Sequence, residues 1–171
     1  MSHRAAQSNA NEKAPQPHWT LEGISARGCV GWREWVSLPE LSLPFVEAKI
    51  DTGARSSSLD ATIVEAFRRK RQSWVRFVVF SDIDLSSAGS IVEAKLIGYR
   101  DVRSSNGVTQ SRPVIETPFR LALDTWTIEL TLTSRRTMGF RLLLGRSAIE
   151  NRYLVDASKS YLAGISPNDR S

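Results

Sequence analysis

The sequence predicts an all-β fold with one short helix near its C-terminal end. From Val30 onward, short apolar stretches are separated by turn residues, which is typical of successive strands and not of alternating strands and helices. A helix is favoured only at residues 146–151, where Ser147 and Glu150 have the spacing of a capping box. We therefore expect roughly six or more strands in a single domain.

The length and composition set the expected domain boundaries. A chain of 171 residues with 41% hydrophobic residues can form one compact core. Residues 1–29 are rich in Ser, Asn, Gln, Pro and Ala and have few large apolar side chains, so we expect a disordered N-terminal tail. The domain is predicted to span residues 30–165, and residues 166–171 are predicted to form a C-terminal tail.

Two stretches are predicted to be strands by their apolar pattern. Residues 125–133 alternate apolar and polar side chains with a period of two, so one face should be buried and the other solvated. Residues 73–80 form a second apolar stretch, which follows the basic run at residues 68–71. We interpret that run as a solvated hairpin tip, with a contact to an acidic peptide as the alternative. Residues 81–89 are small and polar and are expected to form a loop.

A protruding β-hairpin is predicted around Asn106 and Gly107. Polar, strand-like residues 103–105 and 108–110 flank this dipeptide. Asn-Gly favours the positive backbone dihedrals of a two-residue hairpin turn.

The candidate chemistry lies where a strand ends in a tight turn. Residues 46–50 alternate as a strand and lead directly into the Asp-Thr-Gly-Ala run at 51–54. Such a turn can present the Asp51 carboxylate at its tip, because Gly53 allows close backbone approach and the Thr52 hydroxyl can lock the turn. Residues 140–146 form a second apolar strand, which stops at Gly145 and turns into the short helix.

At these two places the chain resembles the retropepsins, whose signature is an Asp-Thr/Ser-Gly-Ala turn followed later by aliphatic residues, Gly and Arg. The matching runs are Asp-Thr-Gly-Ala at 51–54 and Leu-Leu-Gly-Arg at 143–146. The chain is similar in particular to a bacterial branch, also labelled ATP-dependent zinc proteases and associated with ribosomal-protein glutamylation. That likeness extends over residues 30–165 and is clearest at residues 31–36, 49–55, 102–107 and 138–146.

The resemblance implies a closed retropepsin-like β-barrel, the acid-protease fold, and an aspartic endopeptidase that acts on peptide or protein substrates. Each chain supplies one Asp-Thr-Gly motif, so the family mechanism requires a homodimer with one aspartate from each subunit. Two close carboxylates cannot both ionise easily and share a proton, so one can activate water while the other polarises the scissile carbonyl. The hairpin around Gly107 would lie where a retropepsin flap covers the substrate.

The candidate site residues fall into three groups. The catalytic turn comprises Asp51, Thr52 and Gly53; the expected substrate contacts are Ala54, Arg55, Ser56, Asn106 and Gly107; Gly145 and Arg146 are expected to support the site.

Two positions depart from the related families. Retroviral enzymes have an acidic residue directly after the Ala of the motif, where it can pair with the late Arg, whereas this chain has Arg55. Arg146 must therefore find another partner. Bacterial relatives commonly carry His where this chain has Asp60, so any role of that His is lost or taken by a carboxylate.

The sequence argues against metal and nucleotide cofactors. It contains no His-Glu-x-x-His motif, its histidines are His3 and His18 in the tail, and Cys29 is its single cysteine, so we expect no metal. No phosphate-binding Gly-x-x-x-x-Gly-Lys-Ser/Thr loop is present, and no cofactor is expected. Ser56 lies in a serine run, but the predicted domain has no histidine to activate a serine nucleophile.

The charge pattern indicates the expected partners. The net charge of +5 favours acidic partners, and no RNA-binding signature accompanies it, so we expect no nucleic acid. Four tryptophans are interpreted as core residues: Trp32, Trp35, Trp74 and Trp126. Four arginines expected near the cleft favour Asp- or Glu-rich substrates through charge-assisted hydrogen bonds: Arg55, Arg103, Arg112 and Arg146.

A non-catalytic role remains as the alternative function. In that case the domain would bind a glutamate-ligase partner or an acidic peptide tail. The N-terminal residues contain no apolar run that could form a signal peptide or membrane anchor, and Cys29 cannot form an internal disulfide. We therefore expect a cytoplasmic protein without membrane attachment.

Overall fold

A computed structural model describes residues 28–80, 89–103, 107–135 and 139–163. Almost all regular structure in these residues is strand. The elements are β1 (Gly28–Gly31), β2 (Arg33–Leu38), the 3-10 turn η2 (Pro39–Leu41), β3 (Leu43–Asp51), β4 (Ser57–Asp60), β5 (Thr62–Arg69), β6 (Gln72–Val79), β7 (Ser90–Arg103), β8 (Thr109–Leu121), β9 (Asp124–Thr133), β10 (Leu142–Gly145), α1 (Arg146–Ile149) and β11 (Tyr153–Asp156).

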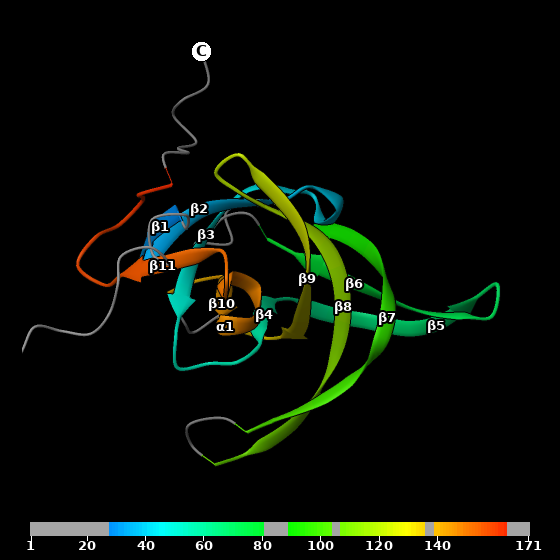
Figure 1. Ribbon diagram of the computed structural model, residues 1–171. Helices are drawn as coiled ribbons and strands as arrows, with labels where there is room; N and C mark the ends of the chain where they lie inside the picture. Colours follow the sequence, from blue (N-terminus) through cyan, green and yellow to red (C-terminus); the bar gives the residue numbers. More distant parts are fainter. Residues whose placement is uncertain (1–27, 81–88, 104–106, 136–138, 164–171) are drawn as a thin grey trace, which may run out of the picture.

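The strands form a closed barrel from which two hairpins project (Figure 1). Hydrogen-bonded neighbours follow the order β2-β3-β10-β4-β9-β8-β7-β6-β5, and a pairing of Ser37 with Arg120 joins β2 to β8. The first six strands in this order therefore close on themselves. This arrangement confirms the predicted all-β fold with a retropepsin-like closed barrel and one short helix.

The core fills the barrel with aliphatic side chains and two phenylalanines. Its largest fully buried members include Phe77, Phe119, Leu59, Leu130, Leu132, Leu142 and Leu144. The four tryptophans expected in the core are only partly buried, so that prediction was too strong. Trp126 illustrates the reason: its ring packs against Phe119, while its indole N–H donates to the carbonyl oxygen of Ala148 at 3.0 Å and needs a polar partner.

The alternation predicted for residues 125–133 is confirmed on its apolar face, but the expected solvated face is wrong at the end of the strand. Ile128, Leu130 and Leu132 are buried, and so are Thr131 and Thr133. The reason is that β9 pairs in parallel with β4, which covers this end. The Thr131 hydroxyl donates to the carbonyl oxygen of Ser57 at 2.9 Å.

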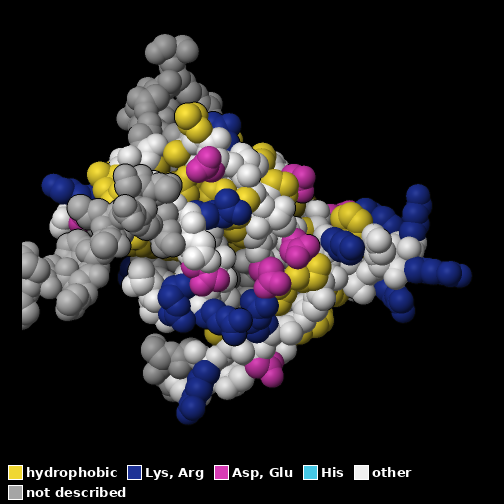
Figure 2. All heavy atoms as spheres, viewed as in Figure 1, with side chains coloured by type: hydrophobic (Ala, Val, Ile, Leu, Met, Phe, Trp, Pro, Cys, Tyr) yellow, Lys and Arg dark blue, Asp and Glu magenta, His cyan; other side chains and the backbone are white. Residues whose placement is uncertain are grey.

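The basic run at residues 68–71 forms the tip of the β5–β6 hairpin, as predicted. Lys70 and Arg71 have φ values of 47° and 67° in the turn. Arg69 pairs with Glu93 on β7 at 2.6 Å. Figure 2 shows the cluster of Lys and Arg side chains at this projecting tip. Of the loop expected at residues 81–89, residues 81–88 lie outside the described part of the chain.

The β7–β8 hairpin protrudes as predicted, but its register differs from that of a two-residue turn. A turn centred on residues 106 and 107 would pair Arg103 with Gln110, whereas Arg103 pairs with Thr109. Gly107 has a φ of +84°, the positive value that an Asn-Gly turn requires, while Asn106 lies outside the described residues.

The short helix is present, but it is not stabilised by the predicted capping box. Gly145 is the N-cap of α1 and supplies no side-chain cap, and Ser147 lies within the helix, where it cannot cap the first amides. No helix in the described part of the chain has the length and apolar character needed to cross a membrane.

Candidate active site

The site is built where two parallel strands end side by side. β3 and β10 pair in parallel, and their last matched residues are Asp51 and Gly145. A Cβ atom on Gly145 would lie 2.6 Å from the carbonyl oxygens of Arg55 and Ser56, so only glycine fits there. The Gly145 amide also donates to Ser57 Oγ at 3.1 Å. The chain that follows Asp51 is therefore held tightly against the end of β10.

The Asp51 carboxylate closes its own turn. Its Oδ1 atom accepts hydrogen bonds from the amides of Gly53 at 3.0 Å and Ala54 at 3.1 Å. These two bonds fix the orientation of the carboxylate, which remains partly exposed. The lock predicted for the Thr52 hydroxyl is therefore provided by the Asp51 side chain itself. The Thr52 side chain is exposed and makes no hydrogen bond among the described residues.

Arg146 finds its partner in the backbone of the same turn. Its guanidinium donates to the carbonyl oxygens of Thr52 at 2.8 Å and Gly53 at 3.0 Å. The amides of Arg146 and Ser147 donate to the carbonyl oxygens of Ala54 at 2.9 Å and Arg55 at 3.0 Å. The first amides of α1 therefore donate to carbonyl oxygens of the Asp51 turn and need no capping box. The Arg146 guanidinium bonds to carbonyl oxygens of the same turn and needs no acidic partner.

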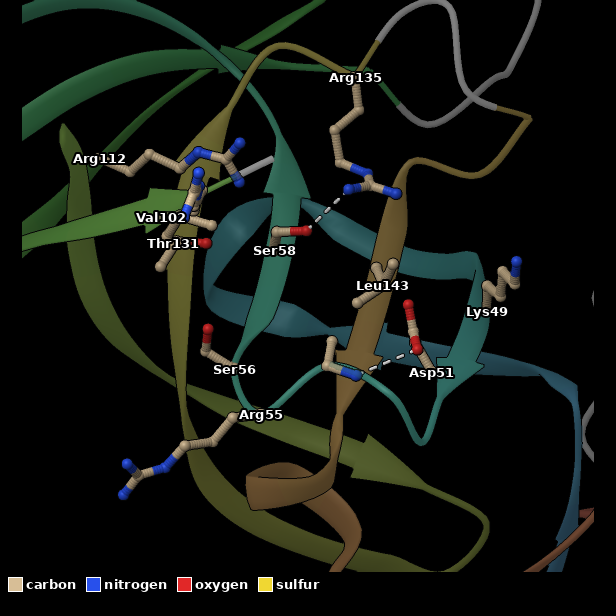
Figure 3. Close-up of a pocket in the computed structure, with 12 residues that line it drawn as sticks. Lys49, Asp51, Arg55, Ser56, Ser58, Val102, Arg112, Thr131, Arg135 and Leu143 are labelled. Atoms are coloured by element: carbon tan, nitrogen blue, oxygen red, sulfur yellow. Dashed lines mark hydrogen bonds between the residues drawn. The ribbon is translucent and has the colours of Figure 1, made fainter. Parts of the chain in front are cut away.

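Asp51 opens onto a cavity of about 510 Å³ (Figure 3). Residues from β3, β4, β7, β8, β9 and β10 contribute to its wall. The lining residues are Lys49, Asp51, Ala54, Arg55, Ser56, Ser58, Val102, Arg103, Arg112, Thr131, Arg135 and Leu143. Asp51 is the single acidic residue in this set, against one lysine and four arginines. The cavity is therefore strongly basic around one carboxylate.

The sequence-predicted residues divide between the cavity wall and its support. Asp51, Ala54, Arg55 and Ser56 line the cavity, but the Arg55 side chain points away from its middle (Figure 3). The other predicted residues frame the turn or lie elsewhere: Thr52, Gly53, Gly145 and Arg146 surround the turn, and Gly107 is not among the lining residues. The β7–β8 hairpin instead contributes Val102, Arg103 and Arg112.

Several lining residues were not predicted as site residues. They are Lys49, Ser58, Val102, Thr131, Arg135 and Leu143. Ser58 and Thr131 meet because β4 pairs in parallel with β9, a contact between distant segments that no local pattern indicates. The position of Arg135 just after the buried strand β9 was the one available sign that it belongs near the site. Arg103 and Arg112, which were expected near the cleft, line the same cavity as Asp51.

Asp60 belongs to a buried ion pair. Its carboxylate pairs with Arg141, and the two side chains are 3% and 4% exposed. It also accepts a hydrogen bond from the backbone amide of Arg135. Asp60 therefore holds the segment that carries Arg135 to the cavity and does not line the cavity itself.

Two arginines on the cavity wall, Arg112 and Arg135, are partly buried and carry like charges, which disfavours their protonated forms. Burial lowers the pKa of Arg112. Burial also lowers the pKa of Arg135, and the positive charge of Arg112 lowers it further, while Asp60 and Asp51 oppose this change. The two guanidinium groups thus repel each other across the same space.

Metal-binding chemistry has no support in the described residues, which contain no group of three His, Cys, Asp or Glu side chains arranged to hold an ion. His3 and His18, the two histidines of the chain, lie outside its described part.

A closed all-β barrel, an Asp-Thr-Gly turn at the end of one strand and a parallel Leu-Leu-Gly-Arg strand beside it define a retropepsin-like domain. The family model described as retropepsin-like aspartic endopeptidase RimB matches residues 29–165. The chain belongs to this RimB-like family.

Known proteins related to this chain carry different names. It is 38% identical over 138 residues to a probable alpha-L-glutamate ligase of Shewanella pealeana, covering 79% of this chain and 30% of that protein. A probable alpha-L-glutamate ligase of Parasynechococcus marenigrum is 42% identical over 138 residues, covering 79% of this chain and 29% of that protein. The chain therefore spans under a third of the length of these relatives.

A solved structure supports the same fold. The crystal structure of Lpg0085 from Legionella pneumophila, a protein of unknown function, superposes with a TM-score of 0.66 at 27% identity. The match covers 80% of this chain and 98% of the Legionella chain.

Proposed function

We propose that this protein is an aspartic endopeptidase in which Asp51 activates the attacking water. The observation that carries the proposal is the fixed Asp51 carboxylate: Gly53 and Ala54 amides orient it at the end of β3, and it opens onto a cavity large enough for peptide side chains. Membership of the retropepsin-like family supports the same chemistry.

The mechanism needs a second carboxylate, which we propose comes from a second copy of the chain. In the described cavity Asp51 has no acidic neighbour. In a homodimer the two Asp51 carboxylates would share one proton, so that one removes a proton from water while the other donates a hydrogen bond to the scissile carbonyl. The exposed Thr52 and Gly53 backbone would then lie beside the subunit boundary. No metal or cofactor takes part in this scheme.

The charge of the cavity favours an acidic peptide substrate. Lys49, Arg55, Arg103, Arg112 and Arg135 line the same space as Asp51. Figure 2 shows Lys and Arg side chains gathered in the lower middle of the viewed face, just above the β7–β8 hairpin. Glutamate or aspartate side chains would offset this charge through charge-assisted hydrogen bonds.

A non-catalytic binding role is the second candidate, and the relatives favour it specifically. Proteins named probable alpha-L-glutamate ligases contain a stretch related to this chain within a longer polypeptide. A separate glutamate ligase, or an acidic peptide tail, is therefore a reasonable partner for this domain. The basic cavity would serve either role.

Cleavage and binding separate the two candidates. We would incubate the purified chain with a proteome-derived peptide library from acid to neutral pH and identify the products by mass spectrometry. The peptidase proposal predicts cleavage that falls by orders of magnitude in Asp51→Asn, which keeps the size of the side chain and its acceptor oxygen. A wild-type chain that binds acidic peptides but never cleaves them would favour the binding role.

A further inference from the structure

Two arginines converge in the cavity from different strands. Arg112 lies on β8 and Arg135 follows β9, and Figure 3 shows their guanidinium groups approaching Ser58 from opposite sides. The side chains of Lys49 and Arg55 point away from this space in the same view. Arg112 and Arg135 are therefore two basic groups positioned to meet a ligand in the cavity that Asp51 lines.

Both arginines are held in place by neutral partners. Arg112 Nε donates to Gln110 Oε1 at 3.0 Å, and the same oxygen accepts from the Thr133 hydroxyl at 3.1 Å. Arg135 Nη1 donates to Ser58 Oγ at 3.1 Å. Neutral partners orient a guanidinium without cancelling its charge. The cavity thus contains two positioned cations whose charge the nearest contacts leave intact.

The local charges do not balance this pair. Asp60 is engaged with Arg141 in the buried ion pair, and Asp51 is the one acidic residue among the described residues that line the cavity. Arg135 Nε is buried and has no hydrogen-bond partner within the described part of the chain. A buried donor without a partner is costly, and two like charges in one cavity raise that cost, unless an anion completes the arrangement.

We propose that Arg112 and Arg135 form a subsite for one carboxylate of the substrate, next to the peptide bond attacked by the water that Asp51 activates. A planar carboxylate can accept hydrogen bonds from both guanidinium groups, including the unpartnered Nε of Arg135, and relieves their mutual repulsion. The subsite rests on the proposed peptidase function and specifies which residues select the substrate. The carboxylate belongs to a Glu or Asp side chain or to a peptide C-terminus.

Binding to an inactive full-length chain tests this subsite without requiring cleavage. In the Asp51→Asn background, we would measure fluorescence anisotropy with three labelled hexapeptides: a glutamate-rich peptide with an amidated C-terminus, its glutamine counterpart, and that counterpart with a free C-terminal carboxylate. We expect one of the two carboxylate peptides to bind about tenfold or more tightly than the neutral one. The carboxylate peptide that binds more tightly than the neutral peptide identifies the source of the carboxylate.

The arginine variants then locate the preference. Arg112→Gln and Arg135→Gln should each reduce it about tenfold, while the neutral peptide is unaffected. Arg120→Gln is the matched control, because it removes the same charge from an exposed position on β8 outside the cavity. Arg135→Lys keeps the charge but not the fork, and should also lose most of the preference. Arg135→Lys replaces Arg135→Gln in the test if thermal unfolding shows that Arg135→Gln is not folded.

Several results would overturn the subsite. They are equal binding of all three peptides, no binding of any at millimolar concentration, or an equal loss in Arg120→Gln, which would indicate diffuse charge attraction. Cleavage by the wild type without dependence on either arginine would refute the subsite and leave the peptidase proposal standing. Binding that depends on both arginines, without any cleavage by the wild type, would refute the peptidase proposal and leave the carboxylate site standing.

Discussion

Removing one partner of the buried ion pair between Asp60 and Arg141 should strongly destabilise the fold. We predict that Asp60→Asn destabilises the chain by about 3–5 kcal/mol, because it leaves the Arg141 guanidinium buried beside a neutral amide. The two side chains are only 3% and 4% exposed, so water cannot replace the lost carboxylate. For a chain of 171 residues this loss corresponds to a fall in the unfolding midpoint of roughly 6–20 °C.

An exposed ion pair provides the control for this prediction. Arg100 and Glu129 pair with side chains that are 40% and 44% exposed, so Glu129→Gln should change stability by less than about 1 kcal/mol. Both variants would be compared with wild type by urea and thermal denaturation monitored by circular dichroism. Replacing both members, as Asp60→Leu with Arg141→Met, should cost less than the sum of the single changes. An Asp60→Asn variant as stable as Glu129→Gln would refute the reasoning.

Three further predictions concern the turn, the pH response and the absence of metal. Gly145→Ala should cost about 1–3 kcal/mol and impair cleavage, because its Cβ would meet fixed backbone atoms, whereas Gly98→Ala, with open space around it, should be tolerated; equal melting temperatures and activities would contradict this. Burial and a hydrogen bond to Asp124 raise the pKa of Tyr153 to about 12, so its contribution to stability is complete below the unfolded pKa of about 10 and is lost between the two values. Titration would be followed by phenolate absorbance in wild type and in Tyr153→Phe. If the difference between them shows no group that titrates near pH 12, the prediction is wrong. Treatment with EDTA or phenanthroline should leave cleavage unchanged, and inhibition that zinc specifically reverses would disprove the metal-free scheme.

The sequence predicted the all-β fold because its signals are local and repeated, whereas closure into a barrel was implied by the resemblance to the retropepsins. Period-two alternation in β9 and the strand-to-turn junction at Asp51 depend on neighbouring residues, which a single sequence displays directly. Buried Thr131 and Thr133 were missed because their burial depends on β4, which lies far away in the chain and pairs in parallel. The capping box was wrong for a similar reason, since the amides that begin α1 are satisfied by carbonyl oxygens of Ala54 and Arg55.

The sequence predicted the part of the site that belongs to the Asp-Thr-Gly-Ala motif. Asp51, Ala54, Arg55 and Ser56 come from one short segment and line the cavity together. Arg135 was missed because it reaches the cavity only through the Asp60 contact that holds its backbone. Such assembly from distant segments is a property of the folded barrel.

Mixing active and inactive subunits tests the shared dyad most directly. Wild-type chain and Asp51→Asn chain would be combined in equal amounts, allowed to exchange, and assayed at fixed total concentration. Since dimers with a single Asp51 are expected to be inactive, activity should fall to about a quarter of that of wild type alone, and not to half. Specific activity should also rise with protein concentration where the dimer is weak. Activity proportional to the amount of wild-type chain at every ratio, in a protein shown to exchange subunits or to remain monomeric, would contradict the shared dyad.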